Sequence, residues 1–138
     1  WFYLVRKDLE KRFHKEIAGS KRQYLMTVAG KTALDKIIKK DFNNPYLQYT
    51  IDPIFVKDNY YVTIIGDYIA ESYLDPKISE KISNIFNSST SVTEEVVASL
   101  QYILETKVKS KLKITRNKAK AQKLKRKLGK NFYKVQGH

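Results

Sequence analysis

Residues 47–70 read LQYTIDPIFVKDNYYVTIIGDYIA and give the strongest evidence for strands in this chain. Both ends of the stretch are rich in Tyr, Ile, Val and Thr, which favour strands. The polar triplet Lys57-Asp58-Asn59 between them is typical of a turn, so the stretch predicts an antiparallel hairpin of strands 47–56 and 60–70. Pro53 cannot donate a ladder hydrogen bond, which places the first strand at a sheet edge or a bulge there.

The N-terminal stretch predicts an amphipathic helix over residues 2–18. Its apolar residues recur at four-residue spacing with charged residues between them, so one face is expected to pack on the core. These residues are Val5, Leu9, Phe13 and Ile17. His14 falls opposite this face and is expected to be solvated.

Other local signals predict one strand and three more helices. The strand covers residues 21–28, and a helix follows over about 30–40. A third helix covers about 76–86, with proline at its first position, and a fourth follows the capping box Ser91-x-x-Glu94. The predicted fold class is α+β: a small antiparallel sheet (hairpin 47–70 plus strand 107–115) packed with three or four helices, and a basic C-terminal helix.

The positive charge of the chain is confined to its C-terminal part. The 138 residues contain 27 Lys and Arg against 14 Asp and Glu, for a net charge of +13. Thirteen of the basic residues and no acid lie from Lys107 onward, so the rest of the chain is neutral. The sequence therefore predicts a neutral body, residues 1–105, and a basic arm, residues 106–138. A charge confined to one segment indicates a contact surface for a polyanion.

Within the arm, the spacing of charge changes from period two to helical. Lysines at 107, 109, 111 and 113 alternate with Val108, Ser110, Leu112 and Ile114, which predicts a strand with one basic and one apolar face. The apolar face is expected to need an apolar floor, which the hairpin would supply. Residues 116–132 predict a basic amphipathic helix with a narrow apolar stripe. The stripe consists of Ala121, Leu124, Leu128 and Phe132.

The function expected from this arm is non-catalytic binding of RNA or DNA through phosphates, in the cytoplasm and without a cofactor or a metal. The alternative is a scaffold or assembly component, extracytoplasmic and tethered through a removed N-terminal helix, that binds an acidic protein or an anionic membrane. The candidate contact residues are Lys107, Lys109, Lys111, Lys113, Arg116, Lys118, Lys120, Lys123, Lys125, Arg126, Lys127 and Lys130.

Signals for catalysis are sparse. The chain has no cysteine, which excludes disulfides, thiolate nucleophiles and zinc sites with sulfur ligands. A metal-dependent nuclease would need carboxylates, for which Asp52, Asp67 and Glu71 are the candidates. Gly30-Lys31-Thr32 resembles the end of a phosphate-binding loop, but Leu25 stands where that loop needs its first glycine. No enzymatic activity is therefore expected.

The pattern Arg22-x-Tyr24-x-Met26-Thr27-x-x-Gly30-x-x-x-Leu34 resembles the wing of winged-helix regulators of the MarR and PadR kind. In those proteins a strand that ends in Leu-Thr-x-x-Gly leads into the next helix. The resemblance implies that Lys21 and Arg22 lie at the wing and touch phosphate. It covers about fifteen residues.

Overall fold

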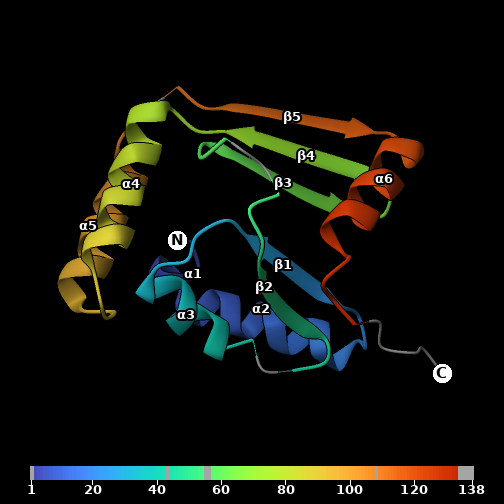
Figure 1. The fold of residues 1–138 in the computed structure, drawn as a ribbon, viewed down its shortest axis with the longest axis horizontal. Coiled ribbons are helices and arrows are strands. Elements are labelled where there is room, and N and C mark those ends of the chain that lie inside the picture. The colour runs from blue at the N-terminus through green and yellow to red at the C-terminus, as the bar shows by residue number, and fades with distance from the viewer. Residues whose placement is uncertain (1, 43, 55–56, 108, 134–138) are drawn as a thin grey trace.

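The structure, a computed structural model, describes residues 2–42, 44–54, 57–107 and 109–133. Over these residues the fold is α+β, with six helices, a two-stranded parallel sheet and a three-stranded antiparallel sheet, which confirms the predicted class (Figure 1). The elements in chain order are α1 (Phe2–Val5), α2 (Lys7–Gly19), β1 (Tyr24–Val28), α3 (Ala33–Lys40), β2 (Leu47–Ile51), β3 (Tyr60–Ile65), β4 (Tyr68–Tyr73), α4 (Pro76–Ser88), α5 (Glu94–Glu105), β5 (Lys111–Arg116) and α6 (Lys118–Leu128).

The predicted hairpin of strands 47–56 and 60–70 is wrong. β2 ends at Ile51, two residues before Pro53, and pairs in parallel with β1. The antiparallel hairpin is formed by β3 and β4 instead. Its two-residue turn begins at Gly66, whose φ of +59° is the left-handed conformation that glycine adopts without steric cost. Phe55 and Val56, which the prediction placed in the first strand, lie outside the described residues.

β1, α3 and β2 form a βαβ unit. A wing is an antiparallel hairpin, so the parallel pairing of β1 with β2 contradicts the resemblance to winged-helix regulators. α3 begins with a capping box in which the hydroxyl of Thr32 and the carboxylate of Asp35 each bind the other residue's backbone N–H. A side chain at Gly30 would collide with this carboxylate. Gly30-Lys31-Thr32 is thus a helix start occupied by an acid, which disfavours phosphate there.

The main core lies between α1, the βαβ unit, α4 and α5. Its buried members are Tyr3, Leu4, Leu34, Ile38, Phe42, Leu47, Tyr49, Ile78, Ile82, Leu100 and Ile103. No residue of the arm belongs to this cluster of described residues. α4 has proline at its N-terminus as predicted. α5 begins later than the predicted cap, because Thr93 rather than Ser91 accepts the hydrogen bond from the backbone of Val96.

The predicted orientation of the first helix is confirmed at Val5 and Ile17, which pack against the core, and is wrong in its middle part. The stretch divides at Arg6 into α1 and α2, which accounts for one helix more than expected. Leu9 and Phe13 are exposed, whereas His14 is buried. The rings of Tyr3, Tyr24 and Phe42 surround the His14 ring, at centroid distances of 5.8, 5.2 and 4.8 Å. This aromatic packing favours the imidazole over Leu9, and burial lowers the His14 pKa below its ordinary value.

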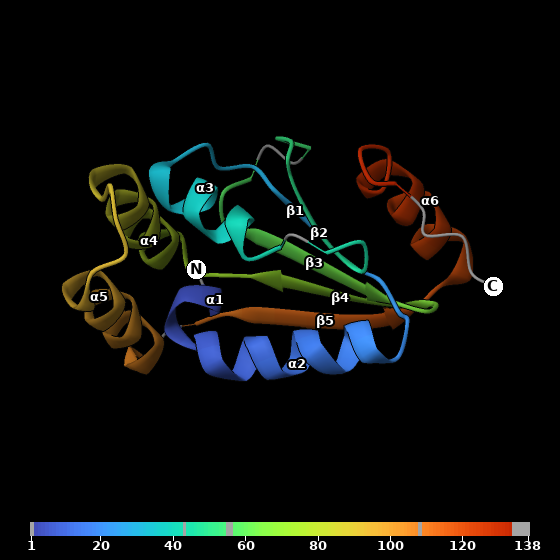
Figure 2. The same cartoon turned by 90° about the horizontal axis from the view of Figure 1, so that it is seen from below.

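β5 pairs antiparallel with β4, so the basic strand does join an antiparallel hairpin as expected, although that hairpin is β3–β4 and not the predicted one. α4 and α5 lie at one end of the three-stranded sheet, and α6 lies at the other (Figures 1 and 2). The arm is therefore not a detached tail: it supplies one edge strand of a sheet and the helix that packs on it.

Candidate nucleic-acid interface

α6 forms where the sequence combines a cap with an apolar stripe. The side chain of Asn117 caps the helix by accepting a hydrogen bond from the backbone of Lys120 at 2.9 Å. Ala121 is fully buried, and Leu124 and Leu128 are half-buried on the same side of the helix. The helix spans Lys118–Leu128, shorter than the predicted 116–132, because β5 continues to Arg116 and the last turn ends at Gly129.

The side of the three-stranded sheet that α6 contacts is named the covered sheet face. Alternation along the strands places Ile69 and Glu71 of β4 on it, with Lys113 of β5 opposite Glu71. Ile69 is fully buried. Lys120 of α6 reaches this face and pairs with Glu71, with its Nζ 2.8 Å from Oε2.

Other cations and polar groups of the arm hold it to the body. The Nζ of Lys125 donates to the backbone carbonyl of Gly66 at 2.6 Å. The carboxylate of Asp52 accepts from Asn131 at 2.7 Å and lies 3.5 Å from the Nζ of Lys130. Gln48 and Tyr133 exchange two hydrogen bonds, at 2.8 and 3.1 Å. Lys120, Lys125 and Lys130 are therefore structural anchors as well as candidate contacts.

The Glu71 carboxylate is stabilised in its charged form. Hydrogen bonds from Lys120 and Tyr60 hold the pKa of Glu71 below its ordinary value, with the charge of Lys113 adding to the effect. Burial and the hydrogen bond to this carboxylate raise the pKa of Tyr60 to about 12. The charged pair thus joins α6 to the middle strand of the sheet.

We expect Glu71→Gln to lower the free energy of unfolding by about 1 kcal/mol at neutral pH, because an amide cannot accept two charge-assisted hydrogen bonds equally well. The effect is modest because the Lys120 side chain is 44% exposed and water screens the pair. The folded-state pKa of Glu71 is depressed, so its stabilisation is complete above the ordinary value of 4.5 and is lost as pH falls through the folded-state pKa.

Urea unfolding of wild type and Glu71→Gln at about pH 7 and about pH 3 measures this difference. The two proteins should differ at the higher pH and converge at the lower one. The matched control is Glu80→Gln, which removes an exposed carboxylate on α4 and should change little at either pH. A constant difference across the pH range would contradict the role of the Glu71 charge.

The lysines before and within β5 do not form the predicted four-lysine strand face. β5 begins at Lys111, so Lys107 and Lys109 precede the strand, and all four are exposed. Lys111 and Lys113 lie on the covered sheet face, near its edge. Val108 and Lys134 lie outside the described residues.

The expected burial of the apolar side of β5 is also wrong. Leu112 and Ile114 are 63% and 64% exposed, on the side of the sheet away from α6. This open sheet face, as we name it, includes Ile65 at 74% exposure and Tyr68 at 53%. Its residues are Tyr61, Thr63, Ile65, Tyr68, Ala70, Ser72, Leu112, Ile114 and Arg116. Alternation along the strands groups these residues, and only Arg116 among them was a candidate contact in the sequence.

The outer surface of α6 presents the remaining cations. Lys118, Lys123 and Arg126 are exposed and lie outside ion-pair distance of any described carboxylate. Lys127 is exposed as well. Arg116 stands on the open sheet face, with its guanidinium 5.8 Å from the centre of the Tyr68 ring. The structure thus distributes the twelve candidate residues over both sides of the sheet, α6, and the segments that precede β5 and follow α6.

The carboxylates considered for a nuclease do not form a metal site in the described residues. The carboxylate of Asp52 already contacts Lys130 and Asn131, and that of Glu71 accepts hydrogen bonds from Lys120 and Tyr60. No group of three His, Asp or Glu side chains within the described ranges could hold a metal ion.

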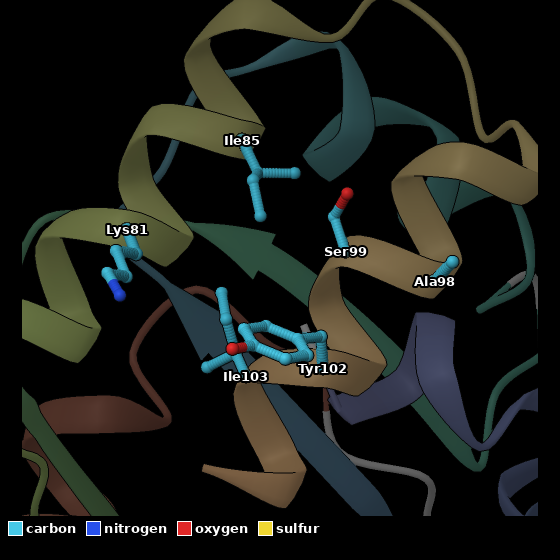
Figure 3. A pocket seen from close by; sticks show the side chains of 6 residues that line it. All are labelled: Lys81, Ile85, Ala98, Ser99, Tyr102 and Ile103. Atoms are coloured by element: carbon cyan, nitrogen blue, oxygen red, sulfur yellow. The ribbon is translucent and has the colours of Figure 1, made fainter.

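A surface depression of about 500 Å³ lies between α4 and α5, where side chains of the two helices face each other (Figure 3). Its lining residues are Lys81, Ile85, Ala98, Ser99, Tyr102 and Ile103. It lies at the end of the three-stranded sheet opposite α6 (Figure 1), so it is separate from the cations of that helix.

Comparisons with protein-family models, with curated proteins and with solved structures found no match for this chain. Among the described helices, none combines the length and apolar composition required to cross a membrane.

Proposed function

We propose that this protein is a non-catalytic nucleic-acid-binding protein or subunit that contacts phosphates through its basic arm, residues 106–138. The observation that carries the proposal is the outer surface of α6. There Lys118, Lys123 and Arg126 stand exposed without a carboxylate partner among the described residues. Cations that the protein itself does not neutralise attract a polyanion and release its counterions on contact.

The contacts of α6 also favour a fixed arrangement of these charges. Asn117 caps α6, and the side chains of Lys120 and Lys125 bind the sheet and its turn. These contacts fix the orientation of the helix and therefore the positions of the cations on its outer surface. Preorganised cations lose less conformational entropy on binding than cations of a disordered tail.

The contacts are proposed to be made mainly to the sugar-phosphate backbone of the nucleic acid and not to its bases. Eleven of the thirteen cations of the arm are lysines, which act as point charges and lack the planar fork that reads base edges. Arg116 and Arg126 are the two arginines, so sequence preference should depend on them. A cytoplasmic location accompanies the proposal, because RNA and DNA are present there.

The test is a fluorescence anisotropy titration of labelled RNA and DNA with the triple variant Lys118→Gln, Lys123→Gln, Arg126→Gln. Glutamine has a helix propensity close to that of lysine and arginine, so α6 should persist. We expect weaker binding to all sequences. The salt dependence should become shallower by about one unit of log–log slope for each phosphate interaction that the substitutions remove.

The matched control removes three exposed cations from α3, with Lys36→Gln, Lys39→Gln and Lys40→Gln. It changes the net charge equally and should leave the slope close to that of wild type. Equal slopes for the two triple variants would contradict the proposal. Binding to anionic vesicles without binding to oligonucleotides would instead favour the tethered scaffold.

A further inference from the structure

The open sheet face has a composition that the phosphate-binding role does not explain. It combines two tyrosines, three large aliphatic residues and one arginine, and it contains no Lys, Asp or Glu. Contiguous exposed apolar surface of this kind marks a binding site. The lysines of β5 point to the opposite side of the sheet, so phosphate contacts alone do not require this face.

The strand register orders the open sheet face into three rows, about 7 Å apart because alternate residues share a face. Direct pairing across the three strands defines each row. The rows are Ile65–Tyr68–Arg116, Thr63–Ala70–Ile114 and Tyr61–Ser72–Leu112. The middle row has small side chains on two of its three strands. The rings of Tyr68 and Tyr61 therefore stand in the outer rows, with lower surface between them.

Arg116 extends the ring surface at one end. Its guanidinium lies 5.8 Å from the centre of the Tyr68 ring, across the β4–β5 pair. A guanidinium plane stacks on bases, and its charge attracts phosphate. The pair thus offers a stacking surface and a cation at the same place.

Three ligands could cover this face: a second copy of the chain, a nucleic-acid duplex or a single strand. Charge and the exposure of the bases favour the single strand. A second copy of the chain would bring a further net charge of +13 toward the first, which opposes association. A duplex hides the flat faces of its bases, so it can offer only backbone and groove edges to a sheet. A single strand presents unpaired bases for stacking and phosphates for Arg116.

We propose that the open sheet face binds unpaired bases of single-stranded nucleic acid, with Tyr68 and Tyr61 as stacking rings. The inference rests on the proposed function and specifies its substrate: the arm supplies phosphate contacts, and the open sheet face selects single strands. Leu112, Ile114 and Ile65 provide apolar surface beside the stacked bases.

The experiment uses the full chain and three labelled probes of about 12 nucleotides, a length within the site sizes of single-strand binders. One is single-stranded, one is the corresponding duplex, and one is a single strand with abasic sites in place of its bases. Wild type should bind the first most tightly. Tyr68→Ala should weaken binding to that probe roughly 5- to 100-fold and leave the abasic probe within about twofold, since the substitution removes only base stacking.

Tyr68→Phe keeps the ring and should retain the affinity of wild type. Leu112→Ser tests the face without removing a ring and should also weaken binding to the single strand selectively. The control is Tyr102→Ala, which removes an exposed tyrosine from α5 and should have no effect.

Equal affinity of wild type for the single strand and the abasic probe, unchanged in Tyr68→Ala, would overturn this inference and leave phosphate binding intact. Binding of polyglutamate but of none of the three probes would overturn the proposed function too, and would favour an acidic protein partner. A stable dimer in sedimentation that Ile114→Lys dissociates, with unchanged affinity for the single strand, would assign the face to a second copy and overturn the inference.

Discussion

Raising the salt concentration from about 50 to about 200 mM should lower the affinity of this protein for nucleic acid by about 10²- to 10⁴-fold. The arm has seven exposed cations that lie outside ion-pair distance of every described carboxylate and make no described ring contact: Lys107, Lys109, Lys111, Lys113, Lys118, Lys123 and Arg126. If about four to seven of them contact phosphate, each contributes a log–log slope of about −0.7 on a single strand and about −0.9 on a duplex.

Anisotropy titrations at five or more salt concentrations would measure the slope. Sucrose at matched osmolality is the control, because it changes water activity without supplying counterions, and it should leave the affinity nearly unchanged. An affinity that stays constant across the salt series would show that binding does not release counterions. This result would contradict phosphate binding by the arm, even if the affinity for nucleic acid were high.

Replacing Ile69 by Ala should lower the free energy of unfolding by about 2–5 kcal/mol, whereas Ile65→Ala should change it by less than about 0.5 kcal/mol. The two isoleucines occupy neighbouring strands but opposite faces of the same sheet. Ile69 is fully buried on the covered sheet face, and Ile65 is 74% exposed on the open one. Removing buried methylene groups forfeits transfer free energy and leaves a cavity, neither of which applies to an exposed side chain.

Urea unfolding of both variants, followed by circular dichroism, would measure the two changes. Ile114→Ala is a second control on the open sheet face, because its side chain is 64% exposed in β5. A larger destabilisation by Ile65→Ala than by Ile69→Ala would mean that the two faces are assigned the wrong way round. The open sheet face would then be inaccessible to a ligand.

The sequence determined the elements that depend on neighbouring residues. Proline after Asp75 set the start of α4. The helix expected over about residues 30–40 is α3, although it begins at Ala33 and not at Gly30. The alternation after Lys107 predicted the strand that joins β4, although β5 begins later than the pattern. Counting charges located the arm without any structure, because that count depends only on the order of residues.

Only the tertiary structure decided which strand pairs with β2 and which side of the three-stranded sheet is covered. β2 was expected to pair with the strand that follows it, yet its partner is β1, which precedes it by one helix. Composition marks a segment as a strand, but pairing depends on distant segments that compete for the same backbone groups.

The orientation of β5 is a second feature that the sequence could not predict. The alternation of lysine with Leu112 and Ile114 defined a basic face and an aliphatic face of this strand. Because burial of apolar side chains is favourable, the aliphatic face was expected to be the covered one. The structure turns the lysine face toward α6 instead, where Glu71 accepts from Lys120 and Ile69 is buried. A period of two defines which residues share a face but not which face is covered, because that depends on where the next helix packs.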